Sequence, residues 1–113
     1  MEKFYEAVDQ AIEHHYYFNN INSVKELVPH YDELGDVKKL IYLFQALSRV
    51  ESDDPNNWQN LVDLLILDQQ YEKALTTLKE ASAAIPAFSS RAYTQSLQIK
   101  DLIKQRDENE NTN

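Results

Sequence analysis

Two apolar stripes in residues 55–86 constrain the fold of this chain more than any other feature. The first stripe has intervals of three and four residues and comprises Trp58, Leu61, Val62 and Leu65. After a break, the same spacing returns at Ala74, Leu75, Leu78 and Ala81. Because such spacing places side chains on one face of an α-helix, the segment is predicted to form two antiparallel helices, each with an apolar face to bury.

The residue types in this segment resemble those of the tetratricopeptide repeat (TPR) family. The residues that carry the resemblance match the family pattern in type and order, and they are Trp58, Leu61, Leu65, Tyr71, Ala74, Leu78, Ala81 and Pro86. Val62 stands where the family prefers Gly or Ala, and Leu65 and Leu78 replace aromatic residues, so the helices are expected to be slightly farther apart. The resemblance implies a helical hairpin that stacks on similar hairpins, with these eight residues as the structural core of the repeat.

The chain also repeats at the period of the family, which is about 34 residues. Positions one period earlier are apolar throughout, at Val24, Leu27, Val28, Tyr31, Leu34, Val37, Leu40, Ile41, Phe44 and Leu47. Positions one period later match less well but keep a helical spacing, at Ala92, Gln95, Ser96, Ile99 and Leu102. Residues 21–54 are therefore predicted to form a divergent repeat, residues 55–88 a full repeat, and residues 89–106 a C-terminal capping helix.

The predicted fold is all-α, a right-handed superhelix of antiparallel helix pairs with about six helices. It forms a single domain over residues 1–106, in which residues 1–20 supply an N-terminal helix that resembles half of a further repeat. With one Gly and no sustained alternation of apolar and polar residues, the chain does not fit a sheet protein. Residues 107–113 have nothing to bury and are predicted to be disordered.

Local signals predict where the helices begin and end. Ser23 and Glu26 form a capping box for a helix that starts near Val24, and Gly35 is expected to end it in the left-handed conformation. Pro29 within this helix predicts a kink or a frayed first turn. The next helices are predicted at about 36–50, 55–67 and 70–85, with Asp54 and Pro55 at the start of the second and a Ser89 or Ser90 cap for the last helix.

Charge and composition limit the classes of partner. The net charge of -8 with only 11 Lys and Arg residues argues against nucleic acid, since phosphate binding needs clustered basic residues. The longest apolar run, Leu64–Leu67, is far shorter than a membrane span, and no export signal is visible at the N-terminus. Cysteine is absent, so no disulfides form. We expect a cytoplasmic location, and a periplasmic or other location stays open if the chain is a fragment.

No catalytic, metal or cofactor motif is recognisable. His14 and His15 are adjacent, so on a helix their side chains point about 100° apart and cannot chelate one ion. The chain has no Cys, no GxSxG sequence and no glycine-rich phosphate loop. We therefore expect no enzyme activity, no cofactor and no bound metal.

The TPR resemblance implies a site on the concave face, where the first helix of each repeat binds extended or helical peptides. At equivalent spacings this face would carry Lys25, Pro29, Asp32, Gln59, Asp63, Ile66, Tyr93, Leu97 and Lys100. Lys25 and Asn60 match two of the five positions with which one subfamily holds the carboxylates of chaperone tails, but Pro29, Ser90 and Thr94 replace the other three. The predicted partner-binding residues are Lys25, Gln59, Asn60, Asp63, Ile66, Tyr93 and Leu97.

The leading functional prediction is a protein–protein interaction module that binds a peptide or protein segment in the concave groove, with a scaffold or adaptor role. One alternative is a structural element that dimerises through the aromatic first helix, which carries Tyr5, Tyr16 and Tyr17, or through the sixth helix. A second alternative is a small secretion-type chaperone, which the length and acidity of the chain allow. The predicted state is a monomer or a weak homodimer.

Overall fold

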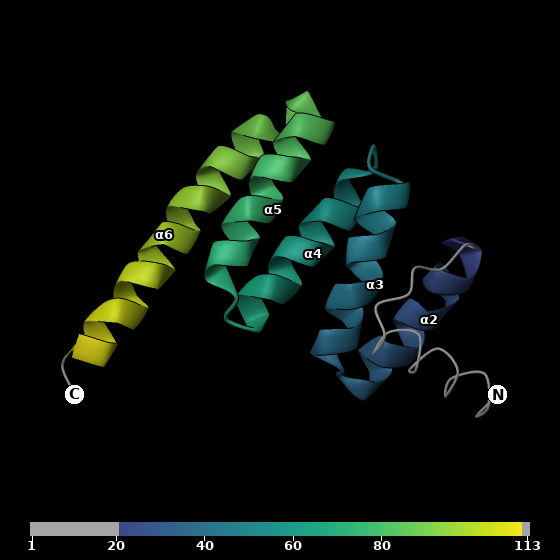
Figure 1. The fold of residues 1–113 in the computed structure, drawn as a ribbon, viewed down its shortest axis with the longest axis horizontal. Helices are drawn as coiled ribbons and strands as arrows, with labels where there is room; N and C mark the ends of the chain where they lie inside the picture. The colour runs from purple at the N-terminus through teal and green to yellow at the C-terminus, as the bar shows by residue number, and fades with distance from the viewer. Residues whose placement is uncertain (1–20, 112–113) are drawn as a thin grey trace.

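The computed structural model describes residues 21–111, and every regular element within this range is helical. The elements are α2 (Ile21–Leu34), α3 (Val37–Val50), α4 (Pro55–Leu67), α5 (Tyr71–Ala84), the short 3-10 helix η1 (Pro86–Phe88) and α6 (Ser89–Asn111), drawn in Figure 1. The all-α prediction is confirmed for these residues. They contain five α-helices, and the predicted helix over residues 1–20, together with the His14–His15 pair, lies outside the described residues.

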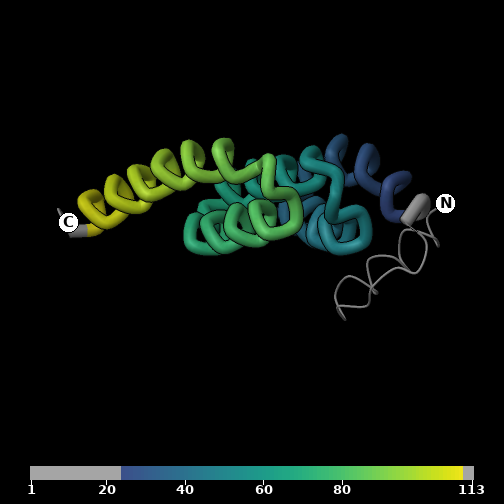
Figure 2. Tube along the Cα trace, turned by 90° about the horizontal axis from the view of Figure 1, so that it is seen from above, coloured from purple at the N-terminus to yellow at the C-terminus, as the bar shows by residue number. Residues whose placement is uncertain are grey.

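The helices are arranged in chain order. Each helix packs mainly against the helix before it and the helix after it, and successive helices run antiparallel (Figure 1). Seen from above, α2, α4 and α6 lie in one layer and α3 and α5 in the other (Figure 2). The buried side chains form one continuous cluster that extends from α2 to α6.

The helix bounds repeat with the same period as the sequence. The first residues of α2, α4 and α6 are separated by one repeat period each, and α3 and α5 have the same offset. Burial follows this period at two sets of equivalent positions, Val24, Trp58 and Ala92, and Tyr31, Leu65 and Ile99. Positions separated by one period are therefore similarly buried, even where their residue types differ.

The eight residues predicted to form the repeat core lie in three kinds of environment. Six are buried, namely Trp58, Leu61, Leu65, Ala74, Leu78 and Ala81. Tyr71 is half-buried, with the guanidinium of Arg106 5.7 Å from its ring centre. Pro86 is exposed, so its assignment to the core is corrected. Its role is in the backbone, because a proline restricts the residue before it to extended conformations, and Ile85 has φ -131° and ψ 93° where α5 ends.

Phe88 is a buried core residue that the sequence analysis did not identify. It lies in η1, outside the helical spacing from which the core was predicted, and the guanidinium of Arg91 lies 4.9 Å from its ring centre. The chain thus enters α6 through a 3-10 turn with a buried aromatic residue, whereas a serine cap was predicted.

The last helix is longer than predicted. α6 continues to Asn111, so the predicted end at residue 106 and the predicted disorder from residue 107 are corrected for residues 107–111. Arg106 pairs with Glu72 of α5 at 2.8 Å, and Gln105 donates a hydrogen bond to Asp101 one turn earlier. The helix continues although residues 107–110 are exposed and Asp and Asn are weak helix formers, and the Arg106–Glu72 pair holds it on α5 where the extension begins.

Two aspartates cap helices, and the cap at Asp54 is the one that the sequence predicts. The Asp36 carboxylate accepts a hydrogen bond from the Lys39 amide at 3.2 Å, and the Asp54 carboxylate accepts one from the Asn56 amide at 2.9 Å. Pro55 is the first residue of α4, where its missing N–H has no helical partner to lose. Pro29 lies inside α2, which is helical on both sides of it, and the side chain of Ser23 in the predicted capping box is outside the described part.

The turns that end α2 and α4 have the same geometry. Gly35 has φ +67°, which confirms the predicted left-handed residue, and Gln69, one sequence period later, has φ +61°. In both turns the amide of the following residue donates to a carbonyl near the end of the helix, Asp36 to Tyr31 at 3.0 Å and Gln70 to Leu65 at 2.8 Å. This motif satisfies backbone carbonyls at a helix end. When the residue in the left-handed conformation is not glycine, that conformation lowers the stability of the fold by about 1 kcal/mol or more.

Substitution at the two turn positions should shift stability in opposite directions. Gln69→Gly should raise the free energy of unfolding by about 1 kcal/mol, because glycine adopts positive φ without the Cβ penalty. Gly35→Ala should lower it by about 1 kcal/mol for the same backbone reason, since no atom lies within 4 Å of the added Cβ. Gln69→Ala is the matched control, which keeps a Cβ and should give no gain. Urea unfolding measures all three, and equal stability of Gln69→Gly and Gln69→Ala would contradict the assignment of strain.

Candidate functional site

A cleft of about 370 Å³ opens between α2, α3 and α4. It is lined by Val28, Asp32, Leu40, Phe44, Asn60, Asp63, Leu64 and Leu67, and we call it the α2–α4 cleft. α3 supplies the buried residues Leu40 and Phe44, while α2 and α4 supply the walls. Its volume falls within the range of ligand sites, and most of its lining is apolar, as in such sites.

Three polar side chains from two helices meet at this cleft. Asp32 lies on α2, Asn60 and Asp63 lie on α4, and all three are exposed. The Asp63 carboxylate accepts a hydrogen bond from the Gln59 amide at 2.8 Å. Within residues 21–111, the side chains of Asp32 and Asn60 take part in no hydrogen bond or ion pair. The cleft can therefore hold an apolar group beneath two carboxylates and a free amide.

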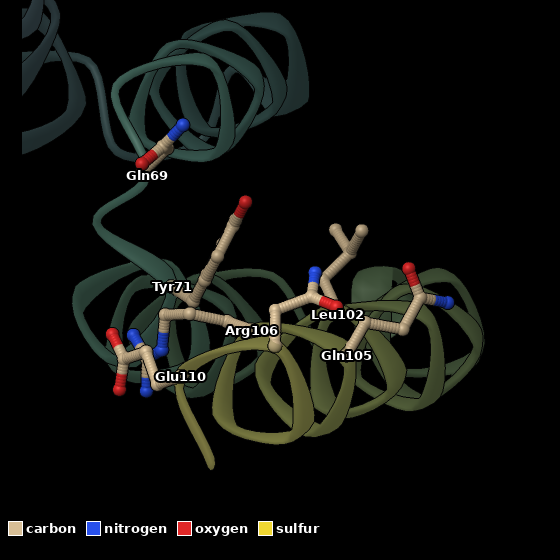
Figure 3. A pocket seen from close by; sticks show the side chains of 7 residues that line it. Gln69, Tyr71, Leu102, Gln105, Arg106 and Glu110 are labelled. Atoms are coloured by element: carbon tan, nitrogen blue, oxygen red, sulfur yellow. The ribbon is translucent and has the colours of Figure 1, made fainter. Parts of the chain in front are cut away.

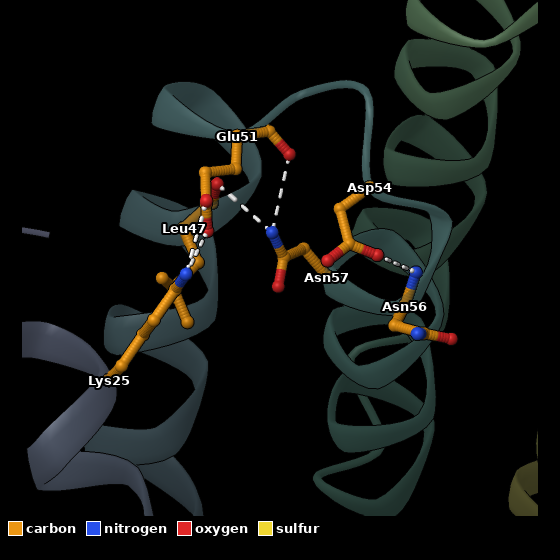
Figure 4. Close-up of polar contacts among 6 residues, drawn as sticks. All are labelled: Lys25, Leu47, Glu51, Asp54, Asn56 and Asn57. Atoms are coloured by element: carbon orange, nitrogen blue, oxygen red, sulfur yellow. Dashed lines mark hydrogen bonds and ion pairs between the residues drawn. The ribbon is translucent and has the colours of Figure 1, made fainter. Parts of the chain in front are cut away.

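Polar contacts at the start of α4 fix how that helix approaches α3 (Figure 4). Asn57, which is only 7% exposed, donates from Nδ2 to the carbonyls of Leu47 at 3.4 Å and Glu51 at 3.2 Å. The Trp58 indole donates to the Ser52 carbonyl at 2.8 Å. These bonds join the start of α4 to carbonyls at and just after the end of α3, and they hold the α3 and α4 sides of the cleft in a fixed relation.

Lys25, predicted to contact a partner, is used within the fold. Its Nζ lies 2.9 Å from Oε1 of Glu51, which follows the last residue of α3 (Figure 4). Lys25 does not line the α2–α4 cleft. The ion pair instead joins α2 to the end of α3.

The predicted groove residues of α4 contact different neighbouring helices. Asn60 and Asp63 line the α2–α4 cleft, whereas Gln59 faces α6. Gln59 and Gln95 exchange two amide hydrogen bonds, at 3.0 Å and 2.7 Å. Ile66 is half-buried against the core cluster, so it is a packing residue. Gln59 and Asp63 thus stay in contact, as their spacing predicts, but only Asp63 lines the cleft, because α4 has a helix of its own layer on either side.

Tyr93 and Leu97 form a separate surface, which we call the α6 patch. They lie one helical turn apart on α6, and they are 68% and 51% exposed. Tyr93 also borders a hollow between α5 and α6 that is lined with Leu78, Ala92 and Ser96. The structure therefore brings Asp32, Asn60 and Asp63 together but leaves the two α6 residues outside that cleft.

A further hollow of about 350 Å³ lies between the start of α5 and the end of α6, where Arg106 lies beside Tyr71 (Figure 3). The Arg106 guanidinium donates to both carboxylate oxygens of Glu72, at 2.8 Å and 3.4 Å, and to Asp107 at 3.2 Å. These bonds raise the pKa of Arg106, and the Arg106 guanidinium lowers the pKa of Glu72. Both charges are thus compensated within the protein, and the ion pair joins α6 to α5.

Lysines near the ends of α3 and α4 are also paired. Lys38 lies 2.8 Å from Asp68, and hydrogen bonds from Lys38 and then Gln70 lower the pKa of that carboxyl group. Lys39 lies 3.5 Å from Asp36. No Lys or Arg lines the α2–α4 cleft, so Asp32 and Asp63 meet no basic side chain among its described walls.

Leu67 is an exposed apolar residue of the cleft that was not among the predicted partner-binding residues. It lies at the rim of the cleft and is 69% exposed. The sequence does hold a signal for it, since Leu67 falls outside the apolar stripe that buries Trp58, Leu61 and Leu65. An apolar residue off the buried face of a helix can mark a contact surface.

Comparison with known proteins gives no match to a family model, a curated protein or a solved structure. Within residues 21–111, no helix is both long and apolar enough to cross a membrane. The same range contains no group of three or more His, Asp or Glu side chains that could hold a metal ion. The geometry of the cleft therefore carries the functional argument.

Truncation of Asn57 tests whether its side-chain hydrogen bonds stabilise the packing of α4 against α3 beside the cleft. Asn57→Ala should lower the free energy of unfolding by about 1 kcal/mol, because the two bonds from the Asn57 amide to carbonyls of α3 and its end are lost, while each carbonyl keeps a backbone donor. Asn56→Ala is the matched control, since Asn56 is exposed and only its backbone amide is hydrogen-bonded. Equal losses in the two variants, measured by urea unfolding, would contradict this role for Asn57.

Proposed function

We propose that this chain is a TPR-type repeat module that binds a segment of another protein in the α2–α4 cleft and has no catalytic activity of its own. The observation that carries the proposal is the meeting of Asp32, Asn60 and Asp63 over the apolar residues of α3. The constant offset of the helix bounds, one repeat period, supports the TPR assignment, as does the layer formed by α2, α4 and α6. A right-handed superhelical path of the helix pairs is part of this proposal.

The composition of the cleft favours binding over catalysis. Its titratable side chains are two exposed aspartates, and its lining contains no nucleophile with an adjacent base. An open, largely apolar cleft with a few polar groups is suited to hold an apolar side chain of a partner while the polar groups fix its orientation. Leu67 at the rim provides apolar surface that such a side chain would cover.

Selection from a random peptide library displayed against the purified domain tests the cleft as a binding site. The selected peptides should share an apolar anchor, and Leu67→Ser should weaken their affinity by roughly tenfold, because the anchor loses apolar contact. Val50→Ser is the matched control, since Val50 is 61% exposed at the end of α3 remote from Leu40. Circular dichroism should show the same helical content in both variants. Peptides that bind Leu67→Ser as tightly as the parent would contradict the proposal.

A second candidate function, self-association, is favoured by the α6 patch. Tyr93 and Leu97 present adjacent apolar surface on the last helix, where no further helix of residues 21–111 covers them. If this patch joins two copies, sedimentation velocity over a roughly hundredfold range of concentration should show a dimer that dissociates on dilution. The Tyr93→Ser/Leu97→Ser variant should remain monomeric, while Val50→Ser should still dimerise. A parent chain that is monomeric throughout the range would exclude this function.

A further inference from the structure

On the basis of the proposed function, we infer that the α2–α4 cleft selects a protein segment in which an apolar anchor is accompanied by Lys or Arg. The anchor would lie on Leu40 and Phe44, and the basic side chains would reach Asp32 and Asp63. The preference follows from the balance of charges at the cleft and from the chemistry of its walls.

The carboxylates of the cleft have no basic partner in the described part of the chain. The Asp32 side chain forms no hydrogen bond or ion pair there, and the Asp63 carboxylate accepts only from the neutral Gln59 amide. The nearby lysines are engaged with other carboxylates, in the pairs Lys25–Glu51, Lys38–Asp68 and Lys39–Asp36. Two uncompensated negative charges on opposite walls of an apolar cleft attract a cationic group and repel an anionic one.

The apolar part of the cleft determines the rest of the segment. Leu40 and Phe44 lie beneath the opening, and the walls add Val28, Leu64 and the exposed Leu67. A Leu-like or Phe-like side chain would remove this surface from water, which is the main favourable contribution to such contacts. The free amide of Asn60 offers both a donor and an acceptor to the backbone of the segment.

The charges at this cleft disfavour the binding of an acidic segment. Its carboxylates would face Asp32 and Asp63, and like charges in contact oppose binding. Lys25, the residue that could have held a carboxylate, is paired with Glu51. The net charge of -8 on the whole chain adds to the repulsion of acidic partners.

Three synthetic peptides of equal length test the inference, each with a central Leu flanked by Arg, by Gln or by Glu residues. Fluorescence anisotropy should show that the Arg peptide binds roughly tenfold or more tightly than the Glu peptide at low salt. Added NaCl should reduce the difference, since the screening length falls from about 10 Å at 0.1 M to about 3 Å at 1 M. The Gln peptide should bind with intermediate affinity that depends little on salt.

Two double variants distinguish the effect of the cleft carboxylates from the effect of the net charge of the chain. Asp32→Asn/Asp63→Asn should remove most of the preference for Arg over Glu, and the new amide oxygen at the second position can still accept the hydrogen bond from Gln59. Glu80→Gln/Glu108→Gln removes the same net charge from exposed sites on α5 and α6, and it should leave the preference almost unchanged. Equal effects of the two double variants would overturn a local role for the cleft carboxylates.

The remaining outcomes distinguish the inference from the proposed function. Equal affinity for all three peptides, lost in Leu67→Ser, would overturn the basic preference while leaving the cleft as the binding site. Binding of the Arg peptide that Leu67→Ser does not weaken would overturn the cleft itself, and failure of all three peptides to bind would overturn both. A dimer of the parent chain that Leu67→Ser dissociates would identify a second copy as the occupant and overturn the basic segment.

Discussion

The apolar face of each helix, which only a neighbouring helix can cover, is the constraint on which the rest of the structure depends. Trp58, Leu61 and Leu65 occupy one face of α4 and belong to the single core cluster that extends from α2 to α6. Each helix is covered mainly by its neighbours in the chain. The same condition explains why α6, the last helix described, exposes Tyr93 and Leu97.

Polar contacts at the helix ends fix the relative positions of the packed helices. The left-handed residues Gly35 and Gln69 end α2 and α4 in the same way, although Gln69 bears a conformational cost that Gly35 avoids. Asn57 joins the start of α4 to carbonyls at the end of α3, and Arg106 joins α6 to Glu72. Neighbouring helices therefore meet at fixed positions as well as along their apolar faces.

The residues that stabilise α4 and the residues that could bind a partner lie on different sides of that helix. The core side chains of α4 point into the cluster, Gln59 bonds to Gln95 of α6, and Asn60 and Asp63 reach the cleft beside α2. Since the exposed cleft residues Asp32, Asn60 and Asp63 lie outside the core cluster, they can vary with the partner while the fold is retained. The proposed preference for a basic segment accordingly depends on a few exposed side chains over an apolar base.

The sequence by itself determined the helices, because their signals are local. The Asp54 cap, the left-handed Gly35 and the end of α4 at Leu67 follow from interactions within a few residues. Only the tertiary structure decided that Lys25 pairs with Glu51, that Pro86 is exposed, and that α6 continues past Arg106, which bonds to α5. It also decided that Asp32 lines the same cleft as Asn60 and Asp63. Two helices line one cleft only when a third helix fixes the distance between them and the rotation of each about its axis. Helical periodicity in the sequence specifies neither the distance nor the rotation.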